Sequence, residues 1–351
     1  QAGDGSDAES GMIGIGEGAL GGTSQGAAYC IAIGNNAMLT TTSATYTVAI
    51  GQGAGQNTST GGNNVFVGAN AGYANTTGTR NIAIGKTAYD ASDTENDNIA
   101  IGYNAMTTNT AGGEKNIAIG SYAGDAITSG DNNVLVGYQA GTKINSGNHN
   151  TFIGYKAGED TTTATEAVAI GDFALNENTT GGGNVAVGHQ ALKYTATGLR
   201  NTAIGLDAGL AITDGDRNTA LGNDTLRAVN TGNYNIGIGY LGGDNITSGS
   251  GNVVIGRADV PSATGDKQLS ISTGSSSTPV WITGDSTGGI YSKAGVVAVT
   301  GNTTLTQAQS GAYVYWTAGT LTLPTNTIVG TQYTIFNNTG SSATVAFGSG
   351  E

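Results

Sequence analysis

A short motif recurs along this chain almost without change: a β-branched residue, a small residue, an aliphatic residue and a glycine. The glycine stands at fifteen positions, and twelve of the fourteen intervals between them are 17 residues while the other two are 18. These glycines are Gly16, Gly34, Gly51, Gly68, Gly85, Gly102, Gly120, Gly137, Gly154, Gly171, Gly188, Gly205, Gly222, Gly239 and Gly256. Such regularity is typical of a solenoid, in which each copy forms one coil on top of the last.

The residue types of the motif indicate strands rather than helices. Apolar residues alternate with a period of two, and 61 of the 351 residues are glycine, which is far too many for helices. Glycine does not recur at every third position, so a collagen helix is excluded as well. We therefore predict an all-β protein whose main part is a parallel β-solenoid of 15 coils, each of 17 or 18 residues.

The two faces of the predicted strand carry different side chains. The outer positions of the triplet are Ile, Val or Thr on one face, and the middle position on the other face is Ala or Gly in eleven copies. We interpret the aliphatic face as the wall of a thin core and the small residues as a stripe where sister chains meet. The alanines of this predicted oligomer interface are Ala32, Ala49, Ala83, Ala100, Ala118, Ala169, Ala186, Ala203 and Ala220.

Asparagine precedes the predicted strand in eleven copies, including Asn64 and Asn252. Stacked in register, these side chains are expected to form a ladder that satisfies turn amides. Cys30, the only cysteine, occupies one of these slots, so the chain cannot form an intrachain disulfide or a cysteine-based zinc site.

The repeat stops near Pro261, and this divides the chain into four predicted parts. Residues 1–11 are an N-terminal segment, 12–259 the solenoid rod, 260–294 a β-shaft or neck, and 295–351 a small antiparallel β domain. That last domain has no charged residue before Glu351, and its aromatic residues suit contact with a neutral sugar. Tyr313, Tyr315 and Trp316 are the candidate sugar-binding residues, although such side chains more often fill the core of so small a domain.

Enzymatic and metal-dependent functions are not expected. Carboxylates cluster at Asp93, Glu95 and Asp97 and at Asp214 and Asp216, but without insertions that could wall a catalytic cleft. The only histidines, His149 and His189, lie in different coils without triad or metal partners. We therefore expect no catalytic residue, metal or cofactor. Threonine pairs such as Thr58 and Thr60 are too irregular to favour an ice-binding surface, which remains a minor alternative.

The net charge also restricts the partners. Twelve basic and 25 acidic residues give −13, so binding to a nucleic acid is not expected. No apolar run approaches the length of a membrane span, and membrane insertion is likewise not expected. The chain begins at Gln1 without a methionine, as a piece of a longer protein would.

Two segments resemble repeats of a known kind: NNVFVGANAGYANTTGTRNIAIG at residues 63–85 and NVLVGYQAGTKINSGNHNTFIGYKAG at 133–158. They resemble the repeats of trimeric phage tail or capsid fibres, and are similar to the head repeats of trimeric autotransporter adhesins of the YadA type. The resemblance covers residues 12–259. It implies a left-handed β-roll with three chains, although the adhesin repeat is usually shorter than 17 residues.

The resemblance leaves two biological settings open. The first is a homotrimeric fibre of a virion, joined to other virion proteins and touching a glycan or receptor on a host surface. The alternative is a bacterial adhesin head or extracellular filament subunit at the cell surface, although neither a coiled-coil stalk nor a membrane anchor is present in this sequence. We expect the virion setting, with adhesion through several weak carbohydrate contacts.

Overall fold

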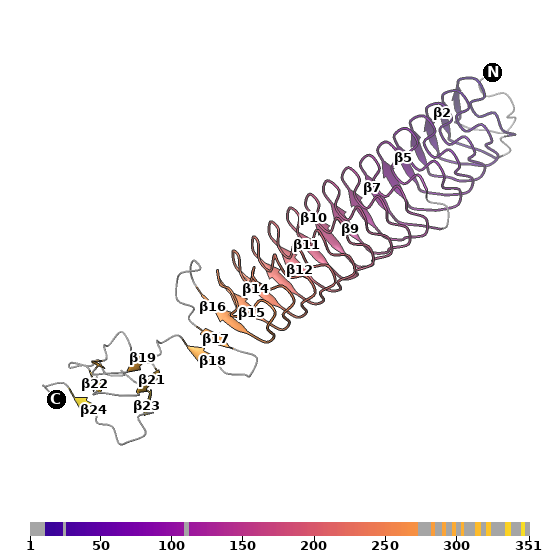
Figure 1. The fold of residues 1–351 in the computed structure, drawn as a ribbon. Coiled ribbons are helices and arrows are strands. Elements are labelled where there is room, and N and C mark those ends of the chain that lie inside the picture. The colour runs from indigo at the N-terminus through magenta and orange to yellow at the C-terminus, as the bar shows by residue number, and fades with distance from the viewer. Residues whose placement is uncertain are drawn as a thin grey trace.

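The chain winds into a long rod of stacked coils (Figure 1). The computed structural model describes residues 11–23, 26–108 and 112–272 in full, and the backbone of eight further short strands up to residue 347. The strands of the rod are β1 (Ile13–Ile15), β2 (Ile31–Ile33), β3 (Val48–Ile50), β4 (Val65–Val67), β5 (Ile82–Ile84), β6 (Ile99–Ile101), β7 (Ile117–Ile119), β8 (Val134–Val136), β9 (Thr151–Ile153), β10 (Val168–Ile170), β11 (Val185–Val187), β12 (Thr202–Ile204), β13 (Thr219–Leu221), β14 (Ile236–Ile238), β15 (Val253–Ile255) and β16 (Leu269–Ile271).

Each strand pairs in parallel with the next one along the chain, so equivalent residues of successive coils lie side by side. Val65 of β4, for example, pairs with Val48 of β3 and with Ile82 of β5. The prediction of a parallel all-β solenoid is confirmed. The sheet continues to β16, whose Leu269 pairs with Val253, so the predicted end of the rod at residue 259 comes too early.

A glycine is required at the corner that follows each strand. Gly68 has a φ of +135°, and a Cβ on it would lie 2.5 Å from the carbonyl oxygen of Gly85 in the next coil. Side chains are disfavoured in that conformation, and this contact is closer than a Cβ tolerates. Identical corners can therefore stack at strand spacing, about 4.8 Å per coil, and the rod is about 70 Å long.

The two faces of the strand are the reverse of the prediction. All nine alanines of the predicted interface stripe are buried completely within their own chain, where they line its core; among them are Ala83 and Ala169. They cannot meet a sister chain. The coil interior is narrow and already holds other side chains, so only a small residue fits there at most strands. The β-branched residues on either side of each alanine point outward.

The core holds about one large apolar side chain per coil. This side chain comes from the strand in some coils and from the turn after it in others. Where the inward strand residue is large, as at Phe66, glycine stands at the facing turn position. A Cβ on Gly55 would lie 2.7 Å from the Phe66 ring, and a Cβ on Gly72 would also collide with it. Where the strand residue is Ala169, the turn position is instead filled by the buried Leu175. In these coils a large side chain at one of the two positions fills the interior without an insertion.

The predicted asparagine ladder is confirmed, and it joins coil to coil. Asn64 donates through Nδ2 to the carbonyl oxygen of Gly78 at 2.8 Å, and its Oδ1 accepts from the amide of Asn81 at 2.8 Å. The same two bonds recur at Asn201, which donates to Gly215 and accepts from Asn218. These buried amides satisfy backbone groups that the short strands cannot reach.

The strands after the rod pair in two different ways. They are β17 (Ile282–Gly284), β18 (Ile290–Ser292), β19 (Val297–Val299), β20 (Thr303–Thr304), β21 (Tyr313–Trp316), β22 (Leu321–Leu323), β23 (Thr334–Asn337) and β24 (Val345–Phe347). β16, β17 and β18 pair antiparallel. β19, β21 and β23 pair in parallel, as do β20, β22 and β24. The prediction of an antiparallel domain over residues 295–351 is therefore wrong for these pairs.

Candidate functional site: the outward face of the sheet

The outward face of the sheet is a stripe of mostly β-branched side chains, apolar except for Thr151, Thr202 and Thr219. Ile84 is 38% exposed and Ile119 is 37% exposed, and the strands between and around them repeat the pattern in register. The other members that are more than a third exposed are Ile13, Ile15, Ile50, Ile153, Ile170, Ile204, Ile236, Ile238 and Ile255. The remaining outward side chains of β1–β15 are half-buried. We call this surface the sheet face.

The sheet face is large enough to be an interface. Each strand is three residues long, and fifteen strands lie side by side. The sheet face therefore measures about 10 Å by 70 Å, an area on the order of 700 Å². Single soluble chains rarely expose a contiguous apolar patch beyond a few hundred Å², and larger ones mark association surfaces. The sequence motif located these residues, but its size pattern suggested that they point inward.

A row of aromatic rings borders the sheet face just after the glycine corner. Six consecutive coils contribute Tyr103, Tyr122, Tyr138, Tyr155, Phe173 and His189, and neighbouring ring centroids lie 5.2 to 6.4 Å apart. Tyr138 and Tyr155 stack face to face, while the other pairs meet edge to face. Tyr103, Tyr138 and Tyr155 remain more than 40% exposed, so the row extends the apolar surface. Sequence reasoning missed it, although the rings follow the corner glycine by one or two residues in successive copies.

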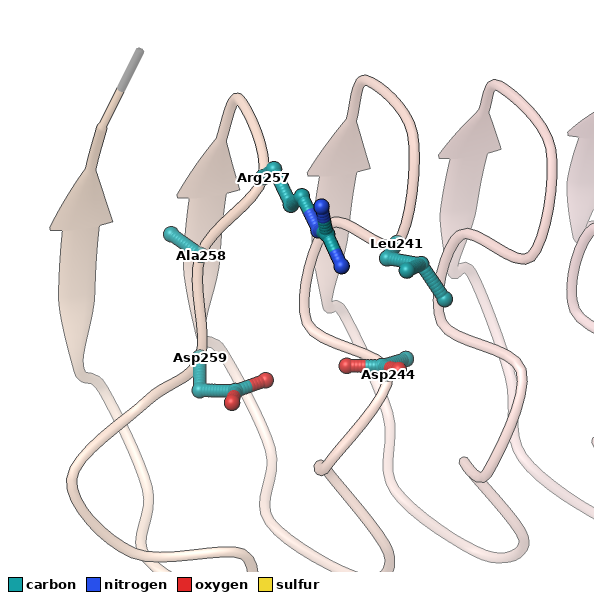
Figure 2. A pocket seen from close by; sticks show the side chains of 5 residues that line it. All are labelled: Leu241, Asp244, Arg257, Ala258 and Asp259. Carbon is teal, nitrogen blue, oxygen red and sulfur yellow. The ribbon is translucent and has the colours of Figure 1, made fainter. Parts of the chain in front are cut away.

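A small pocket lies near the end of the rod, in the last coils before β16 (Figure 2). Its volume is about 180 Å³, and Asp244, Arg257 and Asp259 are among its lining residues. Figure 2 shows the Asp244 and Asp259 carboxyl groups on adjacent coils, with the Arg257 side chain above them. Burial, followed by the hydrogen bond and the negative charge of Asp259, raises the pKa of Asp244 to about 6. The Asp244 carboxyl group is therefore partly protonated at mildly acidic pH.

Two carboxylates of the first acidic cluster noted in the sequence, Glu95 and Asp97, are engaged in structural contacts. Glu95 is buried and accepts hydrogen bonds from the amides of Asp93, Thr94 and Gly112 at 3.0 to 3.1 Å. Asp97 forms a two-bond ion pair with Arg80, and that guanidinium lowers the pKa of Asp97. Neither carboxylate is therefore available as a free acid or base.

Other predicted sites lie apart from one another or outside the side chains described. His149 and His189 are in different coils, and His189 Nδ1 lies 4.0 Å from Asp207. Within residues 11–23, 26–108 and 112–272, no cluster of three or more potential metal ligands occurs. Tyr313, Tyr315 and Trp316 belong to β21, and their side chains lie outside the described part of the chain.

No helix in the described residues has the length and apolar character needed to cross a bilayer. Comparison with protein-family models, curated proteins and solved structures finds no match to this chain.

Proposed function

We propose that this chain is a structural and adhesive fibre protein that works as a parallel homotrimer. The observation that carries the proposal is the sheet face, an apolar surface of about 700 Å² that a lone chain leaves in water. An area of that size matches the share that each partner contributes to a stable protein interface.

The best partner for this face is a second copy of the same face. Its side chains repeat at every coil along a straight rod, so a complementary surface needs the same repeat over the same length. Sister chains provide that repeat, and sheets pack face to face about 10 Å apart. The resemblance to trimeric fibres favours three chains around an axis, each a left-handed β-roll, with the aromatic row at the edges of the contact.

The adhesive role rests on the rod shape and on the resemblance. A stiff trimer holds its end away from a particle and presents three copies of any weak glycan site, which increases avidity. We place it in a virion fibre, attached to other virion proteins; a bacterial surface adhesin or filament subunit is the alternative setting.

Equilibrium sedimentation of the full chain tests the assembly, and three chains per particle is the expected mass. Ile119→Glu would bring three carboxylates together in an apolar contact and should yield monomers. Ser129→Glu is the matched control, because Ser129 is exposed in the same coil away from the strand. A stable monomer of the unmodified chain contradicts the proposal. Binding of the trimer to an immobilised glycan array tests adhesion, and no binding to any glycan contradicts that part.

A further inference from the structure

We infer that the rod binds a carboxylate-bearing sugar in a notch on its flank, where Gly181, Gly182 and Gly183 leave one turn of a coil without side chains. The inference rests on the proposed contact with glycans and names one site and its ligand class. The notch has a volume of about 250 Å³. None of its lining residues belongs to a strand, so it lies apart from the sheet face.

A row of side-chain oxygens runs along this flank and caps backbone amides. Each oxygen belongs to the residue two positions before a ladder asparagine, and it accepts from the equivalent amide of the preceding coil. Asp131 Oδ1 accepts from the amide of Glu114 at 2.8 Å, and Asn148 Oδ1 accepts from that of Asp131 at 2.7 Å. Asp216 Oδ1 accepts from the amide of Leu199 at 2.8 Å.

The row is interrupted at the notch. Thr165, Gly182 and Leu199 are equivalent residues of three successive coils. Gly182 has no side chain that could cap the amide of Thr165. The apolar side chain of Leu199 cannot cap the amide of Gly182. Two amides on adjacent coils, about 4.8 Å apart, therefore lack the side-chain oxygen that the amides of Glu114, Asp131 and Leu199 receive. Both residues line the notch. A carboxylate brings two oxygens and can accept from both amides.

The charges at the notch fit such a ligand. Arg200 lines it, and its stem lies over Gly183, where a Cβ would be 3.2 Å from Arg200 Cγ. In the described part of the chain Arg200 has no ion-pair partner, so its guanidinium is free to meet an anion. Glu166 and the hydroxyl of Thr163 also line the notch and suit sugar hydroxyls. The Glu166 charge repels a dianion such as phosphate more strongly than it repels a singly charged carboxylate.

Gly62 provides an internal comparison. It occupies the same place in an earlier coil and likewise offers no oxygen to the coil before it. The cation beside it, Arg80, is held by Asp97 through bonds of 2.5 and 2.8 Å, and Asn63 fills the position that Gly183 leaves empty. A free cation and two uncapped amides therefore coincide at the Gly183 notch and not at Gly62.

Titration of the full chain with sodium glucuronate, and in parallel with glucose, tests the site by NMR. We expect glucuronate to bind and glucose to bind at least about tenfold more weakly, since it cannot cap the amides. Gly182→Asp restores the missing oxygen and blocks the notch, and Arg200→Gln removes the cation. Each should weaken glucuronate binding about tenfold or more. Gly62→Asp, the matched control, should bind as the unmodified chain does.

Equal binding of glucose and glucuronate overturns the inference, as does unchanged glucuronate binding in Gly182→Asp. No binding of glucuronate to the unmodified chain overturns it as well. Gly182 has no positive φ, and aspartate occupies the equivalent position in other coils, so Gly182→Asp should fold; its thermal unfolding midpoint checks this. A trimer that binds neutral glycans but not glucuronate would leave the proposed function standing. A monomeric chain would contradict that function whatever the titration shows.

Discussion

Gly130 packs so closely against Asn133 that a Cβ on the glycine would lie 3.2 Å from the Asn133 Nδ2 atom. The same spacing recurs along the ladder: ten of its eleven asparagines follow a glycine by three residues. Where that glycine is replaced by Ala164, the asparagine is replaced too, by Ala167. The same holds at Ala27 with Cys30 and at Ala44 with Thr47, whereas Glu95 stands before Asn98 and that amide keeps its ladder bonds. We expect an alanine methyl group at this position to compete with the ladder amide for one space.

A double-mutant cycle at these two positions tests the coupling. Ala167→Asn alone should destabilise the chain, because the new amide meets the Ala164 methyl. With Ala164→Gly added, the amide can cap the backbone of Asn184 as in other coils. We expect a favourable coupling free energy of about 1 kcal/mol or more, measured by urea unfolding. Additive effects of the two substitutions would contradict the proposed competition.

The sequence predicts the coil but not which face of it is inside. The 17-residue period specifies the strands, the corner glycines and the asparagine ladder, because each depends on backbone geometry that repeats. The direction of Ala83 and Ile84 depends on how much room is left by side chains elsewhere in the coil, such as Tyr89. The size rule that larger apolar residues go inward fails where the interior is this narrow. The notch at Gly183 was missed because it depends on missing side chains in one coil.

Cys30 is expected to resist thiol reagents in the folded chain. Its Sγ donates to the carbonyl oxygen of Ala44 at 3.4 Å, in the place where a ladder asparagine would donate. Burial raises the pKa of this thiol, so the reactive thiolate is scarce at neutral pH. Iodoacetamide should label Cys30 readily in urea and very slowly in buffer. Fast labelling of the folded chain would contradict the buried position.

The stability of the last coils should depend on pH through Asp244. Its pKa of about 6 in the folded chain is above the ordinary value of 3.8, so the folded state binds the proton more tightly. The protonated Asp244 carboxyl group therefore contributes to the free energy of unfolding. This contribution is complete below pH 3.8 and is lost as the pH rises through 6. Because Asp244 is only partly buried, we expect the free energy of unfolding to fall by on the order of 1 kcal/mol at most. Hydrogen exchange of residues 253–272 between pH 4 and 8 measures it.

Asp244→Asn is the control for this titration. The amide cannot ionise, so exchange in the last coils should lose its step near pH 6 after correction for the intrinsic rate. An unchanged step would assign the titration to another group.

Glu95 should be essential to its coil. Its buried carboxylate accepts from three backbone amides, and hydrogen bonds to a charged group contribute about 1.5 to 3 kcal/mol each. Glu95→Ala should therefore lower the free energy of unfolding by at least about 2 kcal/mol. Glu177→Gln, at an exposed position, should change it little. Equal effects of the two variants in urea unfolding would show that the buried contacts contribute nothing.

One coil should be able to adopt the core packing pattern of the next. Phe152 and Gly158 share one coil, and the next coil uses Ala169 and Leu175 at the same two places. A Cβ on Gly158 would collide with the Phe152 ring, so Gly158→Leu alone should be strongly destabilising. Phe152→Ala alone leaves a cavity and should cost about 3 to 5 kcal/mol.

Combining Phe152→Ala with Gly158→Leu gives this coil the pattern of the next one. The new leucine needs a positive φ, which Leu175 adopts with +50° and Gly158 already has with +59°. The double variant should therefore recover more than half of the stability lost by Phe152→Ala, measured by urea unfolding. If the double variant is less stable than Phe152→Ala, the strand position and the turn position do not fill one shared space in the core.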